Sequence, residues 1–370
     1  MKLPFTDLSL LYNLDKDEYK KVIMDCVENN SFIMGNYIKE LEKNIRGLLN
    51  INYAIGVSSG TDALYIPLLH LGIKPGDEVI TSPFTFIATA EVIALLGAKP
   101  VFADIEDSTY NIDPSKIEKL ITKKTKAIIP VHLYGHPAEM DQIMEIAKTH
   151  KLFVIEDCCQ AICAEYKNKK VGSIGDCGAL SFFPSKNLGC FGDGGMITTN
   201  SEELDKYYSM IRVHGQEKRY VHEVMGINGR LDNIQAAVLT VRVKRLNEWI
   251  TDRIRLAKIY CEELKKISGI KIPETKKNCK HVFNQFTIRI ENKRDKFQEK
   301  LESFGVPTAV HYPIPLHLQP AFKYLGYSKN DLPVSEKVSA EVISLPIFPG
   351  MNEYQQNFVI DSIKKTVESL

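Results

Sequence analysis

The sequence predicts an α/β fold, and three observations support this class. Between residues 52 and 200, short runs rich in β-branched residues recur, helical patterns lie between them, and the runs are apolar at consecutive positions. Strands that are apolar on both faces are typical of a mainly parallel sheet covered by helices. The runs are EVITS (78–82), PVFADI (100–105), KAIIPVHL (126–133), FVIED (153–157), GALSFF (178–183) and GMITTN (195–200), and the helical patterns include FIATAEVIALLG (86–97) and AEMDQIMEIAKTH (138–150).

A second, smaller domain is predicted to follow a long helix. Residues 231–267 keep helical periodicity without Gly or Pro, which predicts one long helix or two nearly continuous ones, ended by Ser268-Gly269. We therefore place a large α/β domain with an N-terminal helical segment at residues 1–250. A small α+β domain is placed at residues 251–370.

The small domain is expected to contain a strand and two helices. HVFNQFTIRI (281–290) alternates as a strand does, and a charged helix is predicted from Lys293 to Phe304. A Pro-rich stretch surrounds HYPIPLHLQP (311–320), and the last helix is predicted to begin near Asn352.

Composition excludes several classes of function. The 370 residues include 47 Lys and Arg against 46 Asp and Glu, so the formal charge of +1 provides no broad basic field for nucleic acid. The N-terminal residues lack a signal-peptide pattern, and no window approaches the roughly 20 apolar residues of a membrane span. Eight cysteines without a CxxC pair favour reduced thiols in a cytoplasmic protein over a disulfide framework or a metal site. We therefore expect no nucleic-acid partner, no membrane association and no metal.

The segment EDCCQA (156–161) places two acids at the end of a buried strand. The carboxyl ends of strands face the crevice in which α/β proteins bind ligands, so Asp157 is a candidate to pair with a cationic ring nitrogen. A strand-end Asp that caps the following helix is the alternative.

The segment SFFPSKNLGCFGDGG (181–195) leads from a strand through Ser185-Lys186 into a glycine-rich loop. A lysine amine that can be neutral condenses with an aldehyde and shuttles protons, which makes Lys186 the best-placed lysine for such chemistry. A solvated loop lysine is the alternative. The glycines superficially suggest a dinucleotide fingerprint, and thus an oxidoreductase, but they follow a late strand and are better explained as room for backbone to approach a ligand.

Two further segments have the character of anion sites. In GVSSGTDALYIPLL (56–69), small hydroxyl residues lead into a helix, whose free backbone N–H groups suit a phosphate. Ser181 is a further phosphate candidate. In GINGRLDNIQAA (226–237), Asn228 and Arg230 are able to bind anions or hydroxyls. In both segments an ordinary helix cap is the alternative.

Taken jointly, six motifs resemble the DegT family of pyridoxal-5'-phosphate (PLP) dependent nucleotide-sugar aminotransferases, colinearly from near residue 5 to the C-terminus. The resemblance implies a fold-type I aminotransferase with a mainly parallel seven-stranded sheet, working as a homodimer with shared active sites. At Cys158-Cys159 the sequence departs from the small residues usual in the family, and we expect Cys to be tolerated because it is close to Ala in size. The motifs are SSGTDAL, TSPFTFIATAE (81–91), EDCCQA, SFFPSKNLGCFGDGG, GINGRLDNIQAA and HYPIPLHLQPAF (311–322).

The resemblance also implies roles for individual residues. Lys186 would form the Schiff base with PLP, and Asp157 would keep the pyridine nitrogen protonated so that the ring withdraws electrons. The other implied cofactor contacts are a stacking ring from Phe86, Gln160 beside the 3-hydroxyl, Gly60, Thr61 and Ser181 around the phosphate, and Asn228 reaching the phosphate in the partner subunit.

Within the family, residues 211–239 and 306–322 look most like UDP-2-acetamido-2-deoxy-ribo-hexuluronate aminotransferases. These put an amine from L-glutamate on a 3-keto UDP-linked N-acetyl uronic acid used for surface polysaccharide such as lipopolysaccharide O-antigen. A sugar carboxylate requires a cation, and Arg230, His311 and Tyr312 are the candidate substrate contacts. A 3-keto-6-deoxy or 4-keto nucleotide sugar is the alternative substrate, and a PLP-binding regulatory protein without turnover is the alternative from another class.

Overall fold

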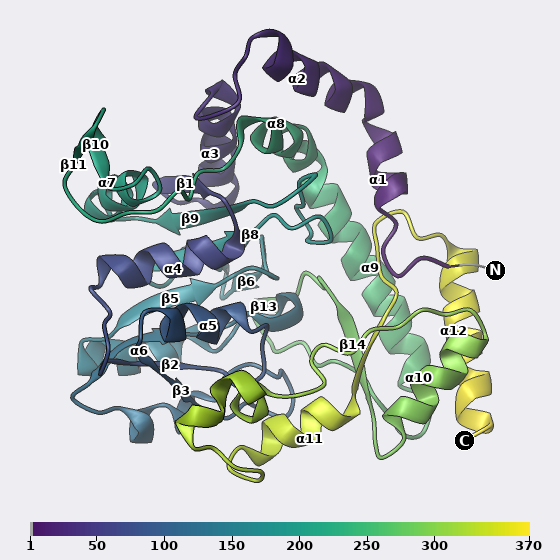
Figure 1. Cartoon of the computed structure of the whole chain (residues 1–370). Coiled ribbons are helices and arrows are strands. Elements are labelled where there is room, and N and C mark those ends of the chain that lie inside the picture. Colours follow the sequence, from purple (N-terminus) through teal and green to yellow (C-terminus); the bar gives the residue numbers. More distant parts are fainter. Residues whose placement is uncertain (1–2) are drawn as a thin grey trace.

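The computed structural model describes residues 3–370, and its centre is a seven-stranded sheet (Figure 1). The strand order is β1-β9-β8-β5-β4-β2-β3, where the strands are β1 (Tyr53–Val57), β2 (Glu78–Thr81), β3 (Lys99–Phe102), β4 (Thr125–Ile129), β5 (Phe153–Asp157), β8 (Cys177–Ser181) and β9 (Gly195–Thr199). Among these described strands, β9 pairs antiparallel with β1 and β8, and the other neighbouring strands pair in parallel. The predicted α/β class and mainly parallel sheet are confirmed.

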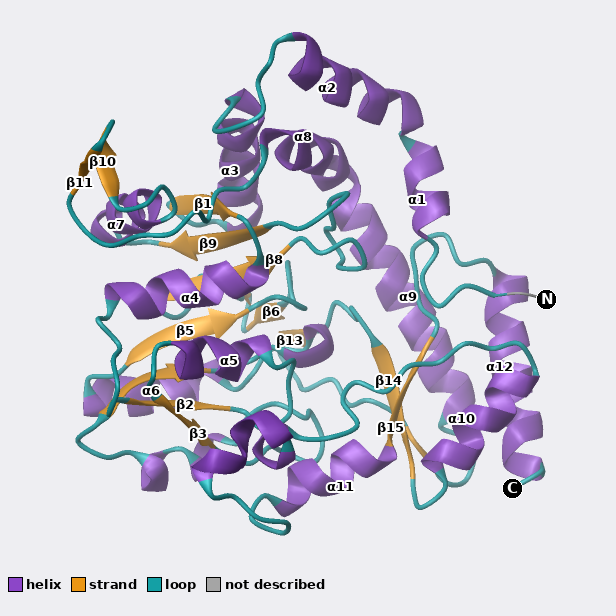
Figure 2. Ribbon diagram, in the orientation of Figure 1, coloured by secondary structure: helices purple, strands orange, loops and turns teal. Residues whose placement is uncertain are grey.

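Helices cover both faces of this sheet, as Figure 2 shows, which explains why its strands are apolar at consecutive positions. Val79 and Ile155 belong to one cluster with helices α4 (Gly60–His70), α5 (Ala88–Leu95) and α7 (Glu202–Ile211). Their chain neighbours Ile80 and Val154 pack on the opposite face against α6 (Met140–His150). Successive side chains of a strand point to opposite faces, so both must be apolar here.

One strand of the sheet was missed by the sequence analysis. β1 (YAIGV) contains Ala and Gly, which are poor strand formers, and it lies at the sheet edge paired only with β9. The packing of α3 (Asn36–Leu49) and α8 (Asn233–Arg242) in the cluster that includes Ala54 of this strand compensates for its weak propensity.

The long helical stretch is two helices joined by a short turn, one of the two forms expected from the sequence. α8 is followed by the 3-10 turn η4 (Val243–Arg245) and then by α9 (Leu246–Leu264). In Figure 1, α9 leads from the large sheet towards the C-terminal elements. Leu246 and Ile250 pack in the cluster around α3 and α8, whereas Leu256 and Tyr260 pack in the C-terminal core.

The C-terminal elements form a three-stranded antiparallel sheet backed by helices. The strands are β12 (Ile270–Lys271), β14 (Phe286–Ile290) and β15 (Val342–Leu345), in the order β12-β14-β15. Helices α10 (Arg294–Ser303) and α12 (Glu353–Glu368) lie where the sequence predicts helices. Asn352 begins α12 with a capping box in which Gln355 bonds back to the Asn352 backbone.

The N-terminal segment packs against the C-terminal part of the molecule, and C-terminal segments pack against the region of the large sheet. The N-terminal helices are α1 (Leu8–Leu14) and α2 (Lys16–Glu28), yet Leu3 packs in the C-terminal core. In the other direction, Val338 of α11 (Pro333–Glu341) packs with Phe84, and Leu316 packs with Phe102 of β3. The domain boundary at residue 250 stays a prediction. Among residues 3–370, no helix has both the length and the apolar character needed to cross a membrane.

Candidate active site

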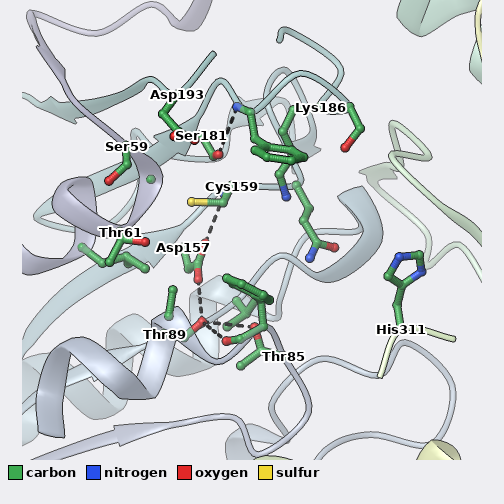
Figure 3. Close-up of a pocket in the computed structure, with 18 of the residues that line it drawn as sticks. Ser59, Thr61, Thr85, Thr89, Asp157, Cys159, Ser181, Lys186, Asp193 and His311 are labelled. Atoms are coloured by element: carbon green, nitrogen blue, oxygen red, sulfur yellow. Dashed lines mark hydrogen bonds between the residues drawn. The ribbon is translucent and has the colours of Figure 1, made fainter. Parts of the chain in front are cut away.

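A cavity of about 490 Å³ lies at the carboxyl ends of β5 and β8, where a mainly parallel sheet is expected to bind its ligand. Figure 3 shows Lys186, Asp157 and His311 around it, brought together from distant parts of the sequence. The start of α4 closes one side, and His311 and Tyr312 from the C-terminal part close another. The residues predicted for the site that line this cavity are Gly60, Thr61, Phe86, Asp157, Gln160, Ser181, Lys186, His311 and Tyr312.

Asp157 is the last residue of β5, and its carboxylate is held on both oxygens. Oδ2 accepts a hydrogen bond of 2.8 Å from the Thr89 hydroxyl, and Oδ1 accepts one of 3.1 Å from the Cys159 N–H. Thr89 Oγ1 also lies 3.1 Å from Thr85 Oγ1. Hydrogen bonds to both oxygens fix the orientation of the carboxylate. The side chain is almost fully buried, and it lines the cavity.

Lys186 lies in the loop after β8. The loop turns back at once, since the Lys186 N–H donates to the Phe183 carbonyl, and Asn187 Nδ2 anchors it by donating to the Val282 carbonyl at 3.2 Å. Burial lowers the pKa of the Lys186 amine and outweighs Cys159 and Asp157, which act to raise it. An amine with a lowered pKa has a larger neutral fraction, which nucleophilic chemistry requires.

The start of α4 forms a close-fitting anion cradle. Ser59 caps the helix by accepting from the Asp62 N–H at 3.1 Å, while Gly60 and Thr61 begin its first turn beside the cavity. A Cβ added at Gly60 would lie 2.7 Å from Ser181 Cβ and 2.9 Å from Cys159 Sγ. Backbone N–H groups at a helix start attract anions, and glycine here lets the start of α4 approach Ser181 closely.

The opposite side of the cavity is aromatic and amide in character. Phe86 remains 55% exposed although it is a large apolar side chain, and its ring centroid lies 6.2 Å from that of Tyr312. Gln160 accepts from the Tyr134 N–H at 2.8 Å and donates to the Tyr312 hydroxyl at 3.1 Å. An exposed phenyl ring at the mouth of a cavity provides a stacking surface for a flat ligand.

Asn228 and Arg230 do not line this cavity in a single chain. They border a neighbouring cavity of about 500 Å³, together with Ser58 and Asp193. Asp193 lines both cavities, so the two are adjacent at the glycine loop. The role of Asn228 and Arg230 in a partner subunit stays a prediction.

Several lining residues were missed by the sequence analysis, notably Thr85, Thr89 and Gln285. Thr85 lies in the segment between β2 and α5, Thr89 lies in the first turn of α5, and their hydroxyl oxygens are 3.1 Å apart. A Thr in an otherwise apolar helical run carries no signal that it will meet an acid from another strand, because that acid lies 68 residues away.

One buried cluster beside the site has the composition of a metal site. Ligand atoms of His132, Glu156 and Cys158 lie within 4.8 Å of one another. However, His132 Nε2 is 3.0 Å from Glu156 Oε2, and the other Glu156 oxygen accepts from the N–H groups of Ile174 and Gly175 at 2.8 Å each. These hydrogen bonds tie the segment before β8 to the end of β5, and they account for the cluster without an ion.

The sequence matches the model of the DegT/DnrJ/EryC1/StrS aminotransferase family over residues 13–364. The chain belongs to this family. Its members are PLP-dependent aminotransferases, so PLP is the cofactor. The enzyme class and the cofactor predicted from the sequence are confirmed.

Curated relatives of this enzyme include two aminotransferases of keto sugars. It is 44% identical to the UDP-2-acetamido-2-deoxy-3-oxo-D-glucuronate aminotransferase of Pseudomonas aeruginosa, over 95% of this chain and 96% of the relative. It is 43% identical to the UDP-N-acetyl-3-dehydro-alpha-D-glucosamine 3-aminotransferase of Acidithiobacillus ferrooxidans, over 99% and 98%. A "Pleiotropic regulatory protein" of Geobacillus stearothermophilus is 48% identical over 98% of both chains.

The fold has a close solved counterpart. The crystal structure of Streptomyces venezuelae DesV, in complex with a ketimine intermediate, superposes with a TM-score of 0.97 at 38% identity, covering 100% of this chain and 99% of DesV. The family enzyme is therefore an aminotransferase of nucleotide-linked keto sugars with the fold-type I architecture.

The cavity fits PLP. The Gly60 cradle, which any larger residue would fill, suits a phosphate. The buried Asp157 carboxylate suits a protonated ring nitrogen, and the partly buried Lys186 amine suits an aldehyde. These three groups belong to one cavity, which is the spatial requirement for a single cofactor.

Proposed function

We propose that the enzyme transfers the amino group of L-glutamate to the 3-keto carbon of a UDP-linked 2-acetamido uronic acid. The product would be a UDP-2-acetamido-3-amino-uronate for surface polysaccharide synthesis. The observation that carries this choice of sugar is the 44% identity to the Pseudomonas aeruginosa enzyme, whose name gives a 3-oxo glucuronate as its substrate.

In this proposal Asp157 and Lys186 carry the chemistry. When bound, PLP supplies an aldehyde that condenses with amines and a protonated ring that withdraws electrons from the adjacent carbon. Asp157, fixed by Thr89, would face the ring nitrogen and favour its protonated form. Lys186 would hold the cofactor through its aldehyde between turnovers, and its Nζ would accept the proton that leaves the amino-bearing carbon of glutamate. With the keto sugar, Lys186 Nζ would return a proton to the substrate carbon.

The remaining cavity residues bind and orient the cofactor. Gly60, Thr61 and Ser181 would hold the phosphate at the start of α4, while Phe86 would stack on the ring. Gln160, already oriented by the Tyr134 backbone, would lie beside the 3-hydroxyl. These contacts anchor both ends of the cofactor and leave the Lys186 side open to substrates.

The need for a cation to bind the substrate carboxylate supports a site shared between two copies of the chain. Among residues 3–370 of one chain, the residues that line the cavity include no arginine. Burial and the nearby Lys186 charge lower the pKa of His311 to about 4, so His311 is neutral near pH 7 and acts there as a hydrogen-bonding group. We therefore assign the cation to Arg230, and a phosphate contact to Asn228, from a second copy in a homodimer.

Half-reactions with purified protein test this function. Glutamate alone should convert the PLP absorption band to that of the amine form, and the UDP-3-keto uronic acid should restore it. Initial rates should give parallel double-reciprocal lines, and intersecting lines would contradict the two-stage exchange. The matched comparison is the same nucleotide sugar with a hydroxymethyl group in place of the carboxylate, which should react at least tenfold less well in kcat/KM.

A second candidate sugar follows from the similarity to the Acidithiobacillus ferrooxidans enzyme, whose named substrate is a 3-dehydro-glucosamine without the carboxylate. Preference for the hydroxymethyl sugar would select this candidate. In that case Arg230→Gln should leave kcat/KM within about twofold, whereas loss of at least tenfold with the uronic acid would support the carboxylate contact. The 3-keto-6-deoxy and 4-keto sugars belong in the same panel.

A further inference from the structure

The imidazole of His311 is bonded to a pair of buried hydroxyl groups. Nδ1 of His311 lies 2.9 Å from Ser344 Oγ, and Ser344 Oγ lies 2.9 Å from Thr287 Oγ1. Ser344 of β15 and Thr287 of β14 are register partners in the antiparallel sheet, and both side chains are buried. The β14–β15 pair therefore places two hydrogen-bonded hydroxyl groups next to a histidine that borders the active-site cavity.

The backbone around His311 is fixed from two directions. The Tyr134 hydroxyl donates to the His311 carbonyl. Ala309, two residues earlier, exchanges backbone hydrogen bonds with Ser344, with N···O distances of 3.2 and 2.7 Å. Removal of the Ser344 hydroxyl leaves these backbone bonds in place, so the hydroxyl can be tested by itself.

Two orders of protons satisfy the hydroxyl groups of this chain. In one, Thr287 donates to Ser344, Ser344 donates to Nδ1 of His311, and the neutral imidazole carries its hydrogen on Nε2. In the reverse order the imidazole carries its hydrogen on Nδ1, and the Thr287 hydroxyl donates to the Tyr134 side chain, to which it is hydrogen-bonded. In both orders Ser344 engages Nδ1 and fixes the rotation of the ring, so Nε2 is the ring nitrogen that remains for a ligand.

We propose that Ser344 is a positioning residue that acts through His311, so that Nε2 forms a hydrogen bond with the keto sugar. The inference rests on the proposed function, since His311 is taken to contact the sugar. It adds a residue outside the cavity to the substrate machinery, and it assigns His311 a hydrogen-bonding role instead of a charge. In Figure 3, His311 lies well apart from Asp157 across the view, in keeping with a role directed at substrate.

The test compares Ser344→Ala with Ser339→Ala in separate half-reactions. Ser339 is an equally buried serine whose Oγ has no hydrogen-bond partner among the described residues. Ser344→Ala should slow the half-reaction with the keto sugar about tenfold, the effect of losing one oriented hydrogen bond, and leave the glutamate half-reaction within about twofold. Ser339→Ala should leave both unchanged.

A double-mutant cycle decides whether Ser344 acts through His311. In the background of His311→Ala, Ser344→Ala should cause no further loss in the sugar half-reaction. An equal loss in both backgrounds, an equal loss in both half-reactions, or no loss at all would overturn the proposal. The cycle uses whichever nucleotide keto sugar the wild-type enzyme prefers, so an error in the choice of sugar is detected separately.

Discussion

The two sides of the active site are built differently. On the cofactor side, Asp157, Thr89, Gly60 and Lys186 come from the large sheet and the loops and helices that directly follow its strands. On the substrate side, His311 and Tyr312 are held across the fold, by Tyr134 and by Gln160, which are 177 and 152 residues away in the chain. On the proposed assignments, the chemistry is fixed by the large sheet and the segments that follow its strands, whereas sugar recognition depends on how distant segments meet.

The largest effect is expected at Lys186. If the chemistry resides on the cofactor side, Lys186→Ala should lower kcat by at least about 1000-fold, because both the aldehyde-holding amine and the proton carrier are lost. Single-turnover absorbance measures this. Lys169→Ala, at an exposed lysine outside the cavity, is the control and should react as wild type. Full activity of Lys186→Ala would contradict the assignment of Lys186 as the aldehyde-holding amine and proton carrier.

Asp157→Asn should have the next largest effect. The amide preserves size but removes the negative charge that holds the ring nitrogen protonated, so kcat should fall about 100-fold. The absorption spectrum of the bound cofactor should shift as well. If Asp157 only caps the following helix, the variant would lose stability with little change in kcat per folded molecule.

The same contrast explains how much could be predicted from the sequence. The position of Asp157 and Lys186 at one cavity was predictable because Asp157 ends one recognisable strand, Lys186 follows another, and parallel strands end at one edge. The six strand runs appear as β2, β3, β4, β5, β8 and β9, whereas β1 and β15 were missed because their short runs depend on tertiary packing. Ser344 was beyond prediction, since only the β14–β15 register brings it to Thr287 and His311.

Acid should destabilise the folded chain through its buried histidines. Burial lowers the pKa of both His136 and His311 to about 4 from an ordinary 6.5. Below pH 6.5 the unfolded chain takes up protons that the folded chain excludes, so stability falls as pH drops from about 6.5 to 4 and is retained above it. Burial is the main cause of the lowered pKa of His136, and acceptance at Nε2 from the Lys276 N–H requires the neutral ring, while the hydrogen bond from Nδ1 to Pro137 O acts in the opposite direction.

For His136 alone the loss approaches about 3 kcal/mol at pH 4. Thermal unfolding measured between pH 7 and 4 should show this decline. His136→Asn should lower stability at pH 7 and flatten the decline, whereas His150→Asn, at an exposed helix end, should leave the slope unchanged. A stability that stays constant between pH 7 and 4 would mean that neither histidine resists protonation in the folded chain.

The smallest effect on kcat is expected at Thr89, which contacts Asp157 on the cofactor side. Thr89 Oγ1 donates to Asp157 Oδ2, and Thr85 lies behind it at 3.1 Å. Thr89→Val keeps the shape but removes the donor, so Asp157 loses orientation and part of the stabilisation of its charge. We expect kcat to fall about tenfold with KM for the sugar unchanged, since Thr89 acts through Asp157 and away from His311.

Two control variants test this assignment. Thr89→Ser should restore the rate, and Thr85→Val should lower kcat by less because Thr85 reaches Asp157 only through Thr89. A rise in KM with kcat preserved would place Thr89 on the substrate side instead and would remove the division between the two sides.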